Sequence, residues 1–224
     1  MQHEGGSVRA DLKIPFCGIL FQKRKGWNEQ RMGRLFILMG KSATGKDTVL
    51  RELLTRPELG LREIVGYTTR PLREKERDGV DYHFVSEGQL EQYRQVGRVL
   101  ECRKYDTVYG PWYYFHVDDG QFSLEEGNKI MTTTLEGYEK IRDYFGSEQI
   151  VPLYLEISDR TRLHRALERE DKQSSPKYAE LCRRFLADNE DFSEEELARL
   201  GIAKRYSNEN LTECLEELAR QIRK

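Results

Sequence analysis

The sequence predicts an α/β fold in which helices cover a mostly parallel central sheet. From Arg34 onward, short apolar runs alternate with amphipathic stretches, as expected when strands are joined by helical crossovers. The amphipathic stretches carry apolar residues three and four positions apart, which is typical of helices with one buried face. The expected strands are 35–39, 99–104, 129–133, 150–157 and 202–206, and the expected helices are 48–55, 87–95, 135–145, 160–168, 177–191 and 211–223.

Residues 1–33 do not share this pattern. They are rich in Gly, Lys and Arg and show neither helical nor strand periodicity. We therefore expect a flexible N-terminal tail over residues 1–33 and one folded domain over residues 34–224. The segments 68–81 and 171–176 also break the alternation, because they are charged and turn-rich, and surface loops of this kind often carry function.

Composition and charge argue against several classes of partner. Charged residues make up 34% of the chain but the formal net charge is only −2, so the surface lacks the basic excess of nucleic-acid-binding proteins. The four cysteines are scattered without a C-x-x-C pair, which argues against a disulfide framework and a zinc site. The apolar run 14–21 is far shorter than the roughly 20 residues that span a bilayer. We expect a cytoplasmic protein that binds neither nucleic acid nor membranes.

A glycine-rich loop follows the first predicted strand and opens the first predicted helix. It matches G-x-x-x-x-G-K and consists of Gly40, Lys41, Ser42, Ala43, Thr44, Gly45, Lys46 and Asp47. In this context backbone N–H groups of the loop point at phosphate oxygens, and the lysine, Lys46, bridges the β- and γ-phosphates of ATP. The sequence therefore predicts a P-loop that binds ATP as a phosphoryl donor. A glycine-rich turn with a surface lysine is the alternative.

The loop departs from the usual pattern where a Ser or Thr helps to hold Mg²⁺. Asp47 stands there, followed by Thr48, and both are candidate metal ligands. A carboxylate beside triphosphate oxygens needs a cation between them. Asp47 is therefore either a direct or water-mediated Mg²⁺ ligand, or a helix-start residue turned away from the site. The segment where P-loop kinases often place an acidic metal partner carries Thr132, Thr133 and Thr134 instead, which favours the ligand role.

The segment 68–86 carries a specific family resemblance. It reads T-T-R-P-L-R-E-K-E-R-D-G-V-D-Y-H-F-V-S and resembles the T-T-R-x-x-R-x-x-E-x-x-G-x-D-Y-x-F-V-S stretch of the guanylate kinase family. The resemblance implies a three-layer P-loop kinase fold with an acceptor-binding insertion at about 66–115 and a short helical lid at about 165–184. It also implies that Arg70, Arg73 and Tyr82 bind the phosphate of a nucleoside monophosphate. Guanidinium groups suit a dianionic phosphate, although a solvated charged loop would look similar.

The resemblance extends to the base of the acceptor. Glu101 and Tyr109 are similar to the family's base-recognition strand and its following Y-G pair, which implies that Glu101 accepts hydrogen bonds from the guanine N–H edge. Three places depart from the family. Gly66 and Pro111 stand where hydroxyl residues are usual, and an acidic residue is missing among Thr132 to Thr134. Phosphate recognition is therefore better supported than base recognition.

Basic residues around the second break resemble the family's ATP lid. Arg165 and Arg169 lie four positions apart on one predicted helix, and Arg184 lies on the next. The resemblance implies that they close over the transferring phosphoryl group and neutralise its charge. A salt-bridged helix surface is the alternative. Asn208, at the end of the last predicted strand, corresponds to the family's adenine-proximal Asn, although a simple turn Asn fits nearly as well.

Three functions are compatible with these residues. The first is ATP- and Mg²⁺-dependent phosphoryl transfer to a nucleoside monophosphate, most simply GMP or dGMP to GDP or dGDP. The second is a sugar-phosphate kinase that resembles ribose 1,5-bisphosphate phosphokinases, which also tend to carry G-K-D in the loop; it accounts for the departures but not for D-G-V-D-Y-H-F-V-S. The third is a catalytically silent guanylate-kinase-like module that binds a protein, against which Lys46 argues. A monomer and a homodimer are both compatible with the sequence.

Overall fold

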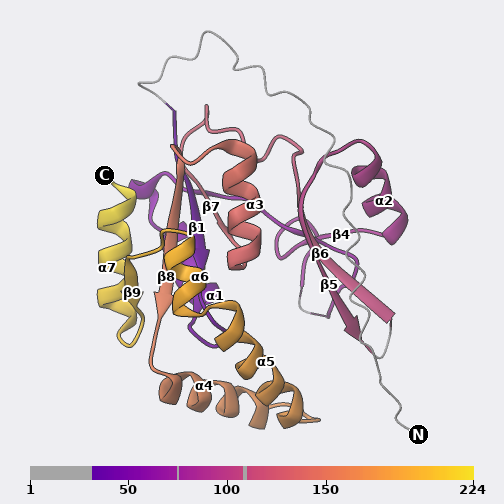
Figure 1. Ribbon diagram of the computed structural model, residues 1–224, viewed down its shortest axis with the longest axis vertical. Helices are drawn as coiled ribbons and strands as arrows, with labels where there is room; N and C mark the ends of the chain where they lie inside the picture. The colour runs from indigo at the N-terminus through magenta and orange to yellow at the C-terminus, as the bar shows by residue number, and fades with distance from the viewer. Residues whose placement is uncertain (1–31, 75, 108–109) are drawn as a thin grey trace, which may run out of the picture. The chain divides into compact units, whose positions relative to one another are not determined.

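The computed structural model describes residues 32–74, 76–107 and 110–224 (Figure 1). Its strands are β1 (Leu35–Met39), β2 (Arg62–Glu63), β3 (Tyr67–Thr68), β4 (His83–Phe84), β5 (Val99–Thr107), β6 (Gly110–Val117), β7 (Lys129–Thr132), β8 (Ile150–Glu156) and β9 (Arg205–Ser207). Its helices are α1 (Lys46–Leu54), the 3₁₀ turn η2 (Pro57–Leu59), α2 (Glu87–Gln95), α3 (Leu135–Phe145), α4 (Asp159–Asp171), α5 (Tyr178–Asp191), α6 (Glu194–Arg199) and α7 (Leu211–Ile222). None of the helices in these ranges is long and apolar enough to cross a membrane. Residues 1–31 lie outside the described residues, so the boundary at residue 33 stays a prediction.

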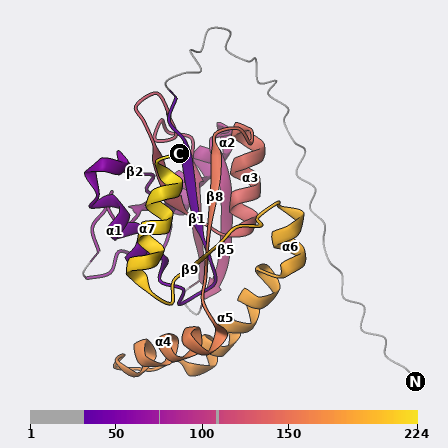
Figure 2. The ribbon, with the colours of Figure 1, turned by 90° about the vertical axis from the view of Figure 1, so that its left-hand side faces the viewer.

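The main sheet is parallel and lies between two helical layers. Within the described residues its strand order is β2-β7-β1-β8-β9, and every neighbouring pair is parallel. Alternate side chains of β1 enter different cores. Leu35, Ile37 and Met39 pack with α3 and α6, whereas Phe36 and Leu38 pack with α1 and α7. Figure 2 shows α1 and α7 on one face of this sheet and α3 on the other, which confirms the predicted α/β fold with a mostly parallel sheet.

A smaller sheet is inserted between β2 and β7 of the main sheet. Its strand order, over the part of the chain that the structure describes, is β4-β3-β6-β5, and β6 runs antiparallel to both β3 and β5. Helix α2 covers one face, where Leu90 packs against Tyr67 and Phe115. α2 begins at a capping box formed by Ser86 and Gln89, each of whose side chains accepts the other's backbone N–H. The sequence at the start of α2 therefore fixes where this helix begins.

The predicted elements are present, but the sequence patterns miss the strand β6 and the helix α6. α2 and α3 have the predicted bounds, and the other predicted helices lie within a few residues of theirs. The strand predicted at 202–206 is present but begins later than predicted, because the backbone N–H of Ile202 donates to the carbonyl of Leu197 (2.8 Å) and closes the end of α6. β9 therefore starts only at Arg205. The patterns also miss β2, β3 and β4, since strands of two residues are too short to show a period.

Candidate active site

The loop between β1 and α1 has the shape of a phosphate cradle. Gly40 and Gly45 have φ angles of +155° and +91°. A Cβ at Gly40 would lie 2.7 Å from a backbone carbonyl oxygen of β8, and one at Gly45 would lie 2.6 Å from Nδ2 of Asn208. The hydroxyl of Thr44 donates to the carbonyl of Lys41 (2.8 Å) and closes the turn inside the loop. Both glycines are therefore required by space as well as by backbone conformation.

Lys46 is the first residue of α1, and its side chain turns back into the loop. Its Nζ donates to the carbonyl oxygens of Gly40 (2.6 Å) and Lys41 (3.2 Å). Burial lowers the pKa of Lys46, while the carboxylates of Asp47 and Asp188 act in the opposite direction. The ammonium group thus lies inside the cradle and is bonded to neutral carbonyls. Phosphate oxygens are stronger partners for it, because a hydrogen bond between two charged groups is stronger than one to a neutral acceptor.

Asp47 and Thr48 lie in the first turn of α1 and are exposed to solvent. Among the described residues, no group of three or more His, Cys, Asp or Glu side chains could hold a metal ion. Thr134, from the segment where an acidic metal partner is usual, instead caps α3 by accepting the backbone N–H of Gly137 (3.2 Å). The metal roles of Asp47 and Thr48 stay predictions.

Asn208 ties the loop to the end of β9. Its Nδ2 donates to the carbonyl of Thr44 (2.7 Å), and its backbone N–H donates to the carbonyl of Glu156 at the end of β8 (3.0 Å). The carbonyl of Asn208 in turn accepts from the guanidinium of Arg165 on α4 (3.1 Å). The structure therefore brings two predicted site residues together at the loop. The predicted contact of Asn208 with adenine stays a prediction.

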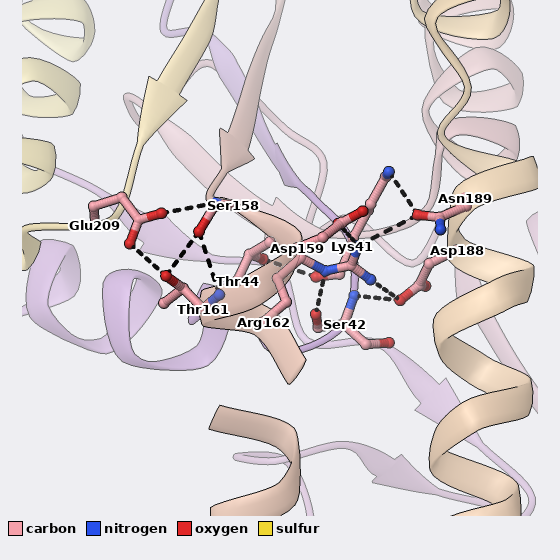
Figure 3. Close-up of polar contacts among 10 residues, drawn as sticks. All are labelled: Lys41, Ser42, Thr44, Ser158, Asp159, Thr161, Arg162, Asp188, Asn189 and Glu209. Carbon is pink, nitrogen blue, oxygen red and sulfur yellow. Dashed lines mark hydrogen bonds and ion pairs between the residues drawn. The ribbon is translucent and has the colours of Figure 1, made fainter. Parts of the chain in front are cut away.

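Three side chains that are not predicted from the sequence hold the tip of the loop (Figure 3). Arg162 of α4 is 1% exposed and donates to the carbonyl of Ser42 (3.1 Å) and to Oδ2 of Asp188 on α5 (2.9 Å). The backbone N–H of Ser42 donates to the same oxygen of Asp188 (2.7 Å), and Nζ of Lys41 donates to Oδ1 of Asn189 (2.8 Å). We call Arg162, Asp188 and Asn189 the loop brace. The loop brace joins α4 and α5 to the loop. Its hydrogen bonds also explain why Arg162 can be buried, since a charged arginine is rarely buried without such partners.

The remaining predicted lid arginines reach the loop from the same two helices. Arg169 of α4 and Arg184 of α5 line one small pocket. The other residues of this pocket are Ser42, Arg162, Ala166, Leu181 and Phe185. Arg184 also forms an ion pair with Glu180 one turn earlier on α5 (3.7 Å). The structure thus places Arg169 and Arg184 beside the loop tip, while Arg165 contacts the backbone of Asn208.

On the acceptor side, Arg70 is buried between two aromatic rings and a carboxylate. Its guanidinium carbon lies 5.3 Å from the ring centre of Tyr82 and 5.2 Å from that of Phe84. Both terminal nitrogens of Arg70 donate to the carboxylate of Glu76 at 2.6 Å, and this pairing lowers the pKa of Glu76. The side chain of Arg73 is 68% exposed, with its backbone N–H on Glu76 (3.0 Å). The structure brings Arg70 and Tyr82 together, whereas the side chain of Arg73 is largely exposed to solvent.

Glu101 lies on β5 opposite His116 of β6. Its Oε1 lies 2.6 Å from Nδ1 of His116, and Nε and one terminal nitrogen of Arg103 donate to its two oxygens at 3.1 and 3.2 Å. Burial acts to raise the pKa of Glu101, but the hydrogen bonds from His116 and Arg103 outweigh it and hold the pKa below its usual value. Neither partner is predicted from the sequence. Tyr109, the other residue predicted to contact the base, lies outside the described residues.

A loop that fits phosphate groups, with arginines of α4 and α5 beside it and Arg70 just after β3 of an inserted sheet, defines a P-loop kinase. A family model described as guanylate kinase matches residues 32–114. The guanylate kinase of Chlorobaculum tepidum is 30% identical over 64% of this chain and 71% of its own length, and that of Porphyromonas gingivalis is 27% identical over 85% and 97%. The solved structure of guanylate kinase from Anaplasma phagocytophilum shares the fold, with a TM-score of 0.62 and 18% identity over 87% of this chain and 86% of that one. The chain belongs to the guanylate kinase family.

Proposed function

We propose that this chain transfers the γ-phosphoryl group of ATP to GMP or dGMP, which yields GDP or dGDP. The observation that carries the proposal is the extent of the family match. Residues 32–114 include both the loop with Lys46 and the acceptor segment with Arg70 and Arg73. A kinase needs both halves, because the donor and acceptor phosphates must be held in line for direct transfer. Relatives named guanylate kinase that match over most of their own length add support.

On the donor side, the loop and Asn208 bind ATP, and Lys46 contacts the β- and γ-phosphates. Arg165, Arg169 and Arg184 act with Lys46 as the catalytic cations, because positive groups around the transferring phosphoryl group stabilise its charge in the transition state. The pocket that Arg169 and Arg184 share with Ser42 supports this assignment. Positioning and electrostatics carry the reaction, so no covalent intermediate on the protein is needed.

On the acceptor side, Arg70, Arg73 and Tyr82 bind the monophosphate, and Glu101 and Tyr109 lie near the nucleoside. Arg70 is held by Glu76 in its present position, and this pairing supports a preset orientation. An incoming phosphate brings two negative charges against the single charge of Glu76. It therefore competes favourably for the same guanidinium group.

Mg²⁺ is the cofactor of this proposal and enters with ATP. Mg²⁺ usually keeps several waters and uses one or two carboxylates together with substrate phosphates, so it needs no dedicated cage of side chains. Asp47 and Thr48 fit this requirement, because both carry oxygen atoms, both are exposed, and they are the two residues after Lys46. When bound, Mg²⁺ neutralises charge on the β- and γ-phosphates.

Neither alternative gains support from the comparisons, whose named relatives are guanylate kinases. We therefore set aside the sugar-phosphate kinase and the silent module. A cytoplasmic location completes the proposal, with ATP and a nucleoside monophosphate as partners, no nucleic acid or membrane partner, and a monomeric or homodimeric state. The formal net charge of −2 supports the lack of a nucleic-acid partner.

An ADP-release assay of the purified chain tests the function. The acceptors are GMP, dGMP, AMP, CMP, UMP and ribose 1,5-bisphosphate, each with ATP and Mg²⁺, and Lys46→Ala provides the background rate. We expect turnover above background with GMP and dGMP. Turnover with ribose 1,5-bisphosphate but not with GMP would overturn the proposed acceptor. A wild-type rate of ADP release equal to the background rate with every acceptor would favour the silent module.

A further inference from the structure

The face of the small sheet that points away from α2 carries a group of polar side chains. Glu101 and Arg103 of β5 lie on it, with His116 and Tyr114 as their cross-strand neighbours on β6. Phe115 lies on the opposite face, in the core under α2, because successive side chains of a strand alternate between faces. We call Glu101, Arg103, Tyr114 and His116 the polar face.

The polar face continues into the phosphate end of the acceptor site. The ring of Tyr82 packs edge-on against Tyr114, with 5.6 Å between ring centres, and the guanidinium carbon of Arg70 lies 5.3 Å from the Tyr82 ring centre. Tyr114 is also the ladder partner of Arg103. A nucleoside monophosphate with its phosphate at Arg70 therefore has its base within the neighbourhood of Arg103.

Arg103 covers Glu101. The side chain of Glu101 is 1% exposed and that of Arg103 is 21% exposed. A carboxylate has about four lone-pair sites, and His116 and the two donors of Arg103 take three of them. Arg103 has five N–H groups; two are used on Glu101, which leaves three. A ligand on the polar face therefore meets N–H donors before it meets a carboxylate.

We propose that Arg103 recognises the acceptor base by donating hydrogen bonds to O6 and N7 of guanine, with Glu101 as the anchor that orients the guanidinium. The proposal rests on the proposed function. O6 and N7 are adjacent acceptors, and an arginine fork fits both at once. Adenine carries an amino group in place of O6, so its donor faces the donors of Arg103 and is rejected.

Two other positions near the acceptor site, residues 66 and 111, offer no side-chain donor to the base. Gly66 and Pro111 carry no hydroxyl or amide group in their side chains. A Cβ at Gly66 would lie 3.1 Å from Nε2 of His116, so His116 already fills the space that a larger side chain at residue 66 would take. Arg103 supplies hydrogen-bond donors that neither position provides.

The test compares GMP with 7-deaza-GMP, which lacks N7, and with IMP, which keeps O6 and N7. We measure kcat/KM of wild type, Arg103→Ala and Arg103→Lys, with Lys104→Ala as the matched control, because Lys104 lies on the other face of β5 and is exposed. A bidentate contact of this kind discriminates by about 1–3 kcal/mol, so Arg103→Ala should lower kcat/KM for GMP by about 5- to 150-fold. It should also lose the preference for GMP over 7-deaza-GMP that wild type and Lys104→Ala show.

The ratio of two substrates within one variant does not depend on how much of that variant is folded, so partial unfolding does not blur the result. Arg103→Ala should lower kcat/KM for IMP by the same factor as for GMP. Arg103→Lys should keep only part of the wild-type kcat/KM, because lysine lacks the two-pronged guanidinium group. A wild type that uses GMP and 7-deaza-GMP equally would overturn the inference while leaving the proposed function intact. So would an Arg103→Ala variant that keeps the wild-type ratio. A wild type inactive on GMP would overturn both.

Discussion

The donor and acceptor sides of the site hold their charged groups in different ways. On the donor side, side chains bind the backbone of the loop: Lys46, Arg162 and Asn208 all donate to its carbonyls, and Asp188 accepts an N–H from it. On the acceptor side, charged side chains bind one another, as Arg70 does with Glu76. The donor loop is thus held by bonds between side chains and backbone, whereas the acceptor side is held by ion pairs whose partners a substrate must share.

The largest effect is expected from Lys46→Ala, which removes the ammonium group inside the cradle. Loss of one preorganised positive or hydrogen-bonding group at a reacting centre commonly lowers kcat by about 10²- to 10³-fold. Circular dichroism should show an unchanged fold, and Lys140→Ala, on the exposed face of α3, is the matched control. A Lys46→Ala enzyme with wild-type turnover would contradict the assignment of the donor side.

Arg70→Ala should act on the acceptor alone. Truncating a buried, charged hydrogen-bonding group costs roughly 1.5–3 kcal/mol, so the KM for GMP should rise about 10- to 150-fold while the KM for ATP stays constant. Arg73→Ala should raise the KM for GMP less, by about 1.5- to 5-fold, because its side chain is largely exposed. Steady-state kinetics with Arg98→Ala as an exposed control measures both. A rise in the KM for ATP alone would mean that the two sides are exchanged.

Asp188→Ala should affect the donor side and leave the acceptor side unchanged. The change removes the shared partner of Arg162 and of the Ser42 N–H, and a buried group left without its hydrogen bond costs about 1–3 kcal/mol. The KM for ATP should rise about 5- to 150-fold, nearer the lower end because Asp188 is partly exposed. Glu190→Ala, exposed on the same helix, is the control. If the KM for GMP rose as much as the KM for ATP, the loop brace would act on the whole fold and not on the donor side alone.

The smallest effect is expected from Asp47→Asn, which tests the metal role. The amide keeps an oxygen but loses the charge that favours a divalent cation. An exposed charge interaction contributes about 0.2–1 kcal/mol, so the Mg²⁺ concentration for half-maximal rate should rise about 1.5- to 5-fold. Mg²⁺ titrations at saturating ATP and GMP measure this concentration. The control is Glu52→Gln, which removes the charge of an exposed carboxylate on α1. Superimposable curves would remove Asp47 from the metal site.

The sequence predicts the donor loop well because its information is local. Gly40, Gly45 and Lys46 lie within one short segment, and the flanking strand and helix have clear periods. The loop brace is not predicted, because it joins residues far apart in the chain: Ser42 and Asp188 are separated by 146 positions. Nothing in a single sequence marks such a pair.

On the acceptor side the sequence predicts which residues belong to the site better than it predicts which side chains surround them. Glu101 is placed near the base by resemblance, and the structure shows it enclosed by Arg103 and His116. A local signal for Arg103 does exist, since residues two apart on a strand share a face. His116 comes from β6, whose aromatic residues point to both faces of the sheet, so that the sequence shows no clean alternation there.

The contact between Asn208 and the loop has a consequence for how the protein is made. Asn208 donates to the carbonyl of Thr44, which precedes it by 164 positions. A contact at such a separation closes a long loop of chain, which costs more entropy than a local contact does. During synthesis the loop leaves the ribosome long before β9 does, so the nascent chain carries the loop without the side chain that holds its Thr44 carbonyl. The nucleotide site is therefore completed only when the last strand joins the sheet.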